Sequence, residues 1–273
     1  ASSLSTSGPG DMSILAVHEW PTNAELIADV AQLYIKPDDE VLDLTYGRGI
    51  WWRKYRPERL WAMCEQGGFT LSPEGPVDVA PDFRYLPDEW RDKFDVVAFD
   101  PPYISIGGRA TSTIDDFNDG YGLLEAMRTP RDLHLYNING LEQASIVTAP
   151  GGLILVKCMA YVSSGALQPV PMWIFEYATT EMGLKLEDWI VHKGEPGPQP
   201  LTDKCPRCKG TGEVTFGSID PEVLCPEVLV DCPMCERAGK VPRRQVHARQ
   251  NASHLFVFKT PGRKRRKKKG PAT

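Results

Sequence analysis

The sequence predicts an α/β protein in which a parallel sheet is covered by helices on both faces. Two observations lead to this fold class. Short apolar runs recur along the first 200 residues, and stretches with apolar positions at helical spacing separate them. Strands buried on both faces read as continuous apolar runs. The chain has 273 residues, 41% hydrophobic and 25% charged, which is enough for one large domain or two small ones.

The expected elements alternate along the chain. The predicted helices lie at 23–34, 141–148 and 172–182. The predicted strands lie at 41–44, 60–64, 95–99, 152–158, 186–192 and 254–258. No apolar run reaches the roughly 20 residues of a membrane span. We therefore expect no membrane partner, and the N-terminus, which lacks a signal-peptide pattern, favours a cytoplasmic protein.

A motif of four residues follows the strand at 95–99. Asp100, Pro101, Pro102 and Tyr103 are poor material for a core but suit the binding of a flat ring that carries an amino group. The carboxylate can accept a hydrogen bond from an exocyclic amine, the prolines fix the backbone, and the tyrosine offers a face for stacking. A base flipped out of its stack is held in this way. The alternative is a strand that simply ends at a Pro-Pro turn.

A glycine turn and several acidic residues precede this motif. Asp43, Gly47 and Gly49 follow the strand at 41–44, where a Gly-x-Gly turn lets a ligand approach the backbone. Glu65 ends the next strand, at the distance where an acid holds a ribose diol in dinucleotide-type sites. Asp82 precedes the strand at 95–99 and can accept from an adenine amine. Glu65 and Asp82 can equally be ordinary exposed carboxylates.

Taken together, these motifs resemble the class I S-adenosylmethionine-dependent methyltransferases, and among them the DNA enzymes that methylate adenine N6 or cytosine N4. The resemblance covers about residues 17–200 and 250–260. It implies a Rossmann-like, seven-stranded sheet and a gamma-like order of motifs. Residues 18–26 match the N-terminal motif beside the methionine end of the cofactor, so Pro21 and Thr22 join the cofactor set. Thr45 stands where the family usually has an aromatic, and Trp51 and Trp52 are candidates to replace it.

The resemblance assigns roles to these residues. S-adenosylmethionine is the expected cofactor, held by Pro21, Thr22, Asp43, Thr45, Gly47, Gly49, Glu65 and Asp82. The target base is expected at Asp100, Pro101, Pro102 and Tyr103, with Asp100 orienting the amine. The motif favours adenine N6 in DNA. The alternatives are an RNA base, because some guanine-N2 ribosomal RNA enzymes share Asp-Pro-Pro-Tyr, and an inactive scaffold that only binds nucleic acid.

Four cysteines in two similar half-sites predict a zinc centre. Cys205 and Cys208 form the first Cys-x-x-Cys pair, and Cys232 and Cys235 form the second. Two such pairs build a tetrahedral site of four thiolates. The halves also resemble the repeats of the DnaJ co-chaperone zinc domain, although only one pair of repeats is present. Cys225 is interpreted as a bystander, and Cys64 and Cys158 as small core residues.

The domain organisation follows from these motifs. We expect a disordered N-terminus at 1–12, a methyltransferase domain at 13–200, a zinc-binding insertion at 201–244, the last strand within 245–260 and a disordered tail at 261–273. The insertion separates the last two strands, beside the expected active site, where it can contact nucleic acid or serve only as a structural staple. The net charge is −5, yet Arg263–Lys269 are all basic, so the tail either binds a polyanion or solubilises the chain.

Overall fold

The computed structural model describes residues 20–64, 68–102, 129–163, 166–193, 202–216, 228–242 and 252–262. The chain divides into two compact units. Unit 1 comprises Ala1–Gly194 and Asn251–Thr273, and unit 2 comprises Glu195–Gln250.

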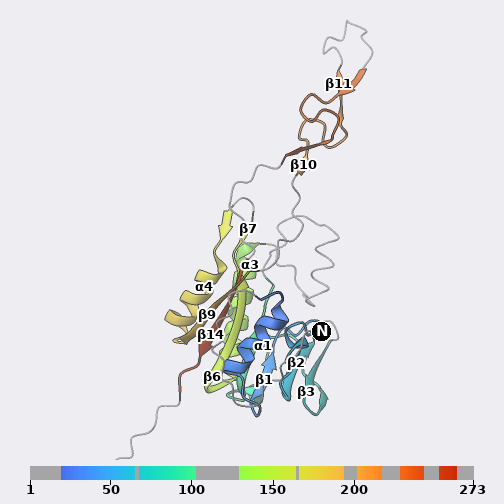
Figure 1. Ribbon diagram of the computed structural model, residues 1–273. Coiled ribbons are helices and arrows are strands. Elements are labelled where there is room, and N and C mark those ends of the chain that lie inside the picture. The colour runs from blue at the N-terminus through green and yellow to red at the C-terminus, as the bar shows by residue number, and fades with distance from the viewer. Residues whose placement is uncertain are drawn as a thin grey trace, which may run out of the picture. The chain divides into compact units, whose positions relative to one another are not determined.

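An eight-stranded mixed sheet forms the centre of unit 1 (Figure 1). From one edge to the other its strands are β4 (Gly75–Val77), β3 (Phe69–Ser72), β2 (Arg59–Cys64), β1 (Glu40–Asp43), β5 (Phe94–Phe99), β6 (Thr148–Met159), β14 (Ala252–Lys259) and β9 (Lys185–Lys193). The four central strands, β2, β1, β5 and β6, are parallel. The strand pairs toward both edges are antiparallel.

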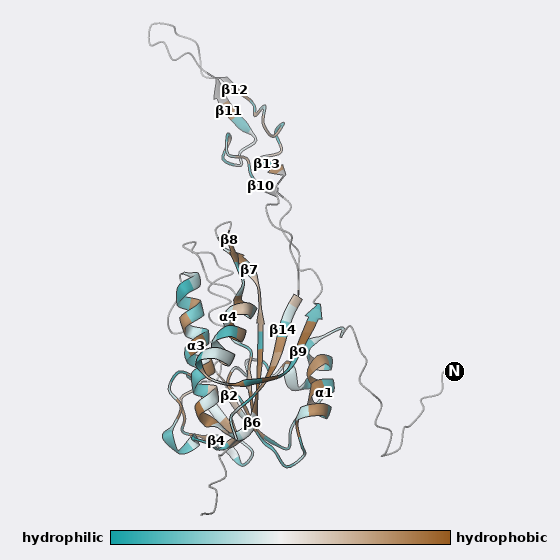
Figure 2. Ribbon diagram, turned by 90° about the vertical axis from the view of Figure 1, so that its left-hand side faces the viewer, coloured by the Kyte–Doolittle hydropathy of each residue, from teal (hydrophilic) through white to brown (hydrophobic). Residues whose placement is uncertain are grey.

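Helices cover both faces of the sheet, as the sequence predicts (Figure 2). Helix α1 (Asn23–Tyr34) packs on one face, together with the 3-10 turn η1 (Trp51–Arg53). On the other face lie α3 (Pro130–Val147) and α4 (Val170–Glu176), the latter continued by the π-helical turn η4 (Tyr177–Glu181). Each face therefore has its own apolar core, and the central strands between them read as apolar runs.

Local sequence explains where α1 and α3 begin. The Thr22 side chain accepts a hydrogen bond from the Glu25 backbone N–H and caps α1. Thr129 and Asp132 form a reciprocal capping box at the start of α3, with Pro130 in the first turn. Both caps satisfy backbone N–H groups that have no partner within their helix.

Three features differ from the sequence-based expectation. In the described residues the sheet has eight strands rather than seven: the six strands expected from the apolar runs and an antiparallel hairpin of β3 and β4 that extends the edge beyond β2. Helix α3 begins at Pro130, well before the predicted residue 141, because the capping box nucleates it within a polar stretch. A short hairpin of β7 (Tyr161–Ser163) and β8 (Ala166–Gln168) follows β6. No helix in the part of the chain that the structure describes is long and apolar enough to cross a membrane.

Unit 2 contains two short antiparallel ribbons. β10 (Thr202–Lys204) pairs with β13 (Lys240–Pro242), and β11 (Glu213–Phe216) pairs with β12 (Val228–Asp231). In the chain this unit follows β9 and precedes β14, which pair with each other in unit 1.

Candidate functional site

A row of polar side chains crosses the sheet near its carboxyl edge. These residues are Asp43 in β1, Asp100 just after β5, Lys157 in β6, Ser253 in β14 and His192 in β9. The strand register places them on the face that α1 covers, because residues two apart share a face. Ligands of open α/β sheets bind outside the carboxyl ends of the strands. This edge is therefore the candidate site.

Asp43 is buried, with 4% of its surface exposed, and both of its carboxylate oxygens accept hydrogen bonds. Trp52 Nε1 donates to Oδ2 at 2.7 Å, and the Thr45 backbone N–H donates to Oδ1 at 2.9 Å. Burial raises the pKa of Asp43 to about 7. The two hydrogen bonds oppose this shift, and the negative charge of Asp100 adds to it. Asp43 thus anchors the turn after β1 and titrates near neutral pH.

Asp100 is held by side chains from two elements. Trp51 Nε1 donates to Oδ2 at 2.8 Å, and the Lys157 ammonium lies 3.8 Å from Oδ1. Burial raises the pKa of Asp100, while the charge of Lys157 and the hydrogen bond from Trp51 oppose the rise. Pro101 and Pro102 lack the N–H groups that would continue the ladder, so β5 ends at Phe99 and the chain turns away.

Thr45 links the two acidic residues. Its hydroxyl oxygen accepts a hydrogen bond from the Asp100 backbone N–H at 2.8 Å, and its own N–H binds Asp43. An aromatic side chain has no oxygen to take this role as an acceptor close to the backbone. Thr45 therefore connects the turn after β1 directly with the motif after β5.

The glycine turn after β1 leaves its backbone accessible. Gly47 and Gly49 have φ of 50° and 64°, which glycine adopts readily. A Cβ at Gly47 would meet nothing closer than the Thr45 oxygen at 3.9 Å, so a ligand has open space there. A Cβ at Gly49 would lie 2.6 Å from the Tyr46 hydroxyl, so this glycine is required by close packing.

Trp51 and Trp52 come from the 3-10 turn that follows the glycines. Each indole N–H binds one of the two acids, and the rings lie 6.2 Å apart. Their sequence-based role as replacements for the missing aromatic at position 45 is untested. The structure adds that they donate hydrogen bonds to Asp43 and Asp100.

Asp82 lies in a separate ion pair. Its carboxylate accepts from Arg84 Nε at 3.0 Å and from Arg84 Nη2 at 2.8 Å, and the Arg84 guanidinium also lies over the Tyr136 ring. Burial acts to raise the pKa of Asp82, but the hydrogen bonds and charge of Arg84 outweigh it and leave this pKa below the ordinary value. An adenine amine at Asp82 would share the carboxylate with Arg84.

Pro21 and Thr22, which the sequence predicts as cofactor residues, lie at the start of α1. Thr22 caps the helix, and both Pro21 and Thr22 are exposed. The neighbouring Trp20 carbonyl lies 3.0 Å from His192 Nε2, which connects this segment to β9 and the polar row. Glu65 and Tyr103 lie outside the described residues.

Lys157 is the residue that sequence reasoning missed. It is 4% exposed, within a strand whose neighbours are apolar. Lysine is almost never fully buried unless it is paired. A charged residue in the otherwise apolar run at 153–158 was thus the signal that could have found it.

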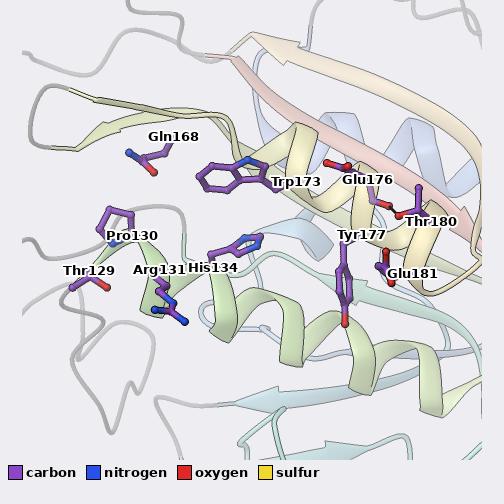
Figure 3. Close-up of a pocket in the computed structure, with 10 residues that line it drawn as sticks. All are labelled: Thr129, Pro130, Arg131, His134, Gln168, Trp173, Glu176, Tyr177, Thr180 and Glu181. Carbon is purple, nitrogen blue, oxygen red and sulfur yellow. Dashed lines mark hydrogen bonds between the residues drawn. The ribbon is translucent and has the colours of Figure 1, made fainter.

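A separate cavity of about 650 Å³ lies between α3 and α4 (Figure 3). His134 and Trp173 meet edge to face across it, with ring centroids 5.0 Å apart. Its lining residues are Thr129, Pro130, Arg131, His134, Gln168, Trp173, Glu176, Tyr177, Thr180 and Glu181. None of them belongs to the predicted cofactor or base set. The cavity adjoins the helices on the face opposite Asp43.

The four cysteines of unit 2 converge as the sequence predicts. Their sulfur atoms all lie within 4.8 Å of one another, and all four residues are buried. Cys205 Sγ lies 3.7 Å from Cys232 Sγ, and Cys208 Sγ lies 3.6 Å from Cys235 Sγ. A tetrahedral zinc with bonds of about 2.3 Å requires sulfur atoms about 3.8 Å apart. The donor set therefore fits Zn²⁺.

The two halves of the centre are related by a shift of 27 positions along the chain. The Cys205 N–H donates to the Gly239 carbonyl at 2.9 Å, and the Cys232 N–H donates to the Gly212 carbonyl at 2.8 Å. A Cβ at Gly212 would lie 2.4 Å from the Arg237 oxygen. A Cβ at Gly239 would lie 2.5 Å from the Gly210 oxygen, so Gly212 and Gly239, each four residues after the second cysteine of its half, are both needed for close approach.

Backbone N–H groups favour the thiolate form of Cys208 and of Cys232, whereas burial and the neighbouring sulfur of Cys208 raise the pKa of Cys235. Gly212 donates to Cys208 Sγ at 3.3 Å. Burial acts to raise the pKa of Cys208, but hydrogen bonds from Gly212 and Gly210 outweigh it and lower this pKa to about 6. Thiolates are the form that binds metal. Cys225 lies outside the described residues, while Cys64 and Cys158 are buried in the sheet, as expected of core residues.

Comparisons with known proteins give distant structural similarities. No family model matches the sequence, and no curated protein matches it. A putative methyltransferase from Bacillus halodurans C-125 is 12% identical over 86% of this chain and 98% of its own, with a TM-score of 0.41. The antibiotic-resistance methyltransferase Kmr is 12% identical over 88% of this chain and 93% of its own, with a TM-score of 0.32.

A putative DNA modification methylase from Thermus thermophilus is 11% identical, with a TM-score of 0.34. The match covers 67% of this chain and 53% of that protein, so this chain spans about half its length. A structure of the same protein was solved with S-adenosyl-L-methionine. With TM-scores below 0.5, these similarities leave the activity and substrate of this chain open.

Proposed function

We propose that this protein is an S-adenosylmethionine-dependent methyltransferase that acts on the exocyclic amino group of a base in DNA, with adenine N6 favoured over cytosine N4. One observation carries the proposal. Asp100 and the Gly47–Gly49 turn lie at the same edge of the sheet, joined by Thr45. An acceptor for an amine thus stands next to a turn that leaves backbone open to a cofactor.

The cofactor, when bound, supplies a methyl group on a positively charged sulfur. Asp43, Thr45, Gly47 and Gly49 would hold it, together with Pro21 and Thr22 at the start of α1. Glu65 and Asp82 complete the set proposed from the sequence. Hydrogen bonds from Trp52 and Thr45 keep the Asp43 carboxylate fixed before any ligand arrives, which lowers the entropy lost on binding.

The target base is assigned to Asp100, Pro101, Pro102 and Tyr103. Asp100 accepts a hydrogen bond from the amine and orients the nitrogen, while the two prolines hold the backbone rigid. The catalytic contribution of Asp100 is orientation and offset of the positive charge that grows on the nitrogen.

The zinc unit is proposed to contact nucleic acid. Its exposed basic residues Lys204, Arg207, Lys209 and Lys240 suit phosphate contacts, whereas Arg237 is paired with Glu213 and Asp231. The basic segment Arg263–Lys269 adds affinity that depends on salt but not on sequence.

A paired variant tests this role. Arg207→Ala with Lys209→Ala should weaken DNA binding about tenfold while one zinc per chain remains. The matched control removes two exposed charges from unit 1, Lys36→Ala with Arg91→Ala, and should leave binding unchanged. Equal affinity in both variants would show that the unit is only a structural staple.

Methyl transfer is tested directly. The protein is incubated with labelled cofactor and either unmethylated DNA or RNA, and the nucleosides are then analysed. N6-methyladenine in DNA is expected, and Asp100→Ala should abolish it. A methylated RNA base would support the RNA alternative. Absence of methylation, together with no cofactor binding by calorimetry, would leave a nucleic-acid-binding module on an inactive scaffold.

A further inference from the structure

Lys157 is a buried cation in the middle of the sheet. Its side chain is 5% exposed and it comes from β6, where Leu155 and Val156 precede it in the apolar core. A buried ammonium is costly unless a charge or several acceptors compensate it. The compensation includes the Asp100 carboxylate, whose Oδ1 lies 3.8 Å from Lys157 Nζ.

The pair is part of a fixed arrangement around Asp100. Trp51 binds the other carboxylate oxygen at 2.8 Å, and Thr45 holds the Asp100 backbone N–H at 2.8 Å. Lys157 comes from β6, Trp51 from η1 and Thr45 from the turn after β1. The Asp100 carboxylate is therefore oriented by the protein itself, without help from a ligand.

We propose that Lys157 is a positioning residue, whose ammonium holds the Asp100 carboxylate ready to accept from the target amine. This inference rests on the proposed function, because it assigns a role within the same site. Lys157 acts through Asp100 and touches neither the cofactor nor the base in this scheme.

The chemistry requires Asp100 in its ionised form. A carboxylate only accepts hydrogen bonds, whereas a protonated carboxyl would direct an O–H at the nitrogen lone pair that must attack. The charged and titratable groups around the pair are Asp43 from β1, Cys158 from β6 and His192 from β9. Asp43 opposes ionisation of Asp100 when it is charged, so Lys157 is the cation that counters both burial and this neighbour.

Removal of the Lys157 charge should raise the pKa of Asp100. Burial raises the pKa of Asp100, and Lys157 is the largest opposing influence. Without the ammonium, this pKa rises further, so a larger fraction of Asp100 is protonated at a given pH. Activity then falls at neutral pH and returns as the pH rises.

Lys157→Met tests the proposal because it keeps the length of the side chain and removes the charge. At pH 7 its kcat should fall at least about tenfold, with the acidic limb of the kcat profile shifted to higher pH by about one unit or more. Lys157→Arg keeps the charge and should retain a profile near that of the wild type.

The matched control is Lys93→Met. Lys93 is a half-buried lysine whose ammonium lies 3.5 Å from the centroid of the Trp61 ring, outside the polar row. Its loss should lower stability without moving the pH profile. If Lys157→Met lowers activity by the same factor at every pH, Lys157 is merely structural and the proposal is overturned.

A titration separates this inference from the proposed function. The Asp100 carboxyl pKa is measured by carbon-13 NMR without substrate, with Asp100→Asn giving the assignment. An upward shift of about one unit or more in Lys157→Met is expected, and an unchanged value would refute the role of Lys157. Failure of the wild-type protein to methylate any substrate would instead refute the proposed function, whatever the titration shows. Thermal melts establish that each variant is folded.

Discussion

Protonation of the buried Asp43 side chain makes the stability of the fold depend on pH. In the folded protein burial raises its pKa to about 7, whereas the unfolded chain keeps the ordinary value near 4. The folded state therefore binds a proton more tightly than the unfolded state between these values. The resulting stabilisation is complete below about pH 4 and is lost as the pH rises through 7.

Replacement of Asp43 by Asn should remove this dependence. In the cofactor-free wild type, Asp43 should contribute a fall of about 3 kcal/mol in the free energy of unfolding between pH 5 and pH 8. The fall should be smaller by that amount in Asp43→Asn. Urea titrations at the two pH values measure both proteins, and equal pH dependence in the two would contradict the assignment.

The elements of unit 2 are short, and its two Cys-x-x-Cys pairs lie at their centre. The described part of unit 2 contains short ribbons and four buried cysteines, but few apolar side chains to support them. Small units of this kind usually need a metal. We therefore expect unit 2 to unfold when zinc is lost, while unit 1 keeps its own core.

A cysteine substitution tests the dependence on zinc. Cys232→Ser should reduce the zinc content from about one ion per chain to near zero, because structural zinc sites use four protein ligands. Amide protection should disappear from unit 2 and persist in β5 and β6. Cys225→Ser is the control and should keep its zinc. Full zinc content in Cys232→Ser would rule out the four-cysteine centre.

The elements also show what a sequence pattern can and cannot locate. Helix α1 and strands β1, β2, β5, β9 and β14 agree with the prediction to within one or two residues, because their apolar positions repeat clearly. The hairpin of β3 and β4 was not predicted, since its strands are too short to show a period. In α3 the first turn is polar, and the Thr129–Asp132 capping box marks its start.

In the whole molecule, unit 2 is inserted in the sequence between β9 and β14, two strands of unit 1 that pair with each other. Lys193 and Ala252 are direct partners at the end of this antiparallel pair, and unit 2 lies between them in sequence. A hairpin turn can join such partners without disturbing the ladder. Unit 1 should therefore fold when unit 2 is replaced by a turn.

This replacement separates cofactor binding from nucleic-acid binding. With residues 194–251 exchanged for a turn of about four residues, cofactor affinity should stay close to that of the full chain. DNA affinity should fall at least about tenfold, as the basic residues of unit 2 are lost. Calorimetry with S-adenosylmethionine and DNA-binding titrations measure the two effects. Unchanged DNA affinity would remove unit 2 from the proposed interface.

Local sequence is enough to identify six strands of the large sheet, the end of β5 and the four cysteines that can share a metal. These features depend on local composition and short spacings, such as Asp100-Pro101-Pro102 after an apolar run and two Cys-x-x-Cys pairs. The contacts that hold Asp100, from Trp51 and Lys157, follow only from how the strands are arranged in the folded sheet. The Asp100 contacts join residues about fifty positions apart, so they depend on strand order and register, which local sequence does not encode.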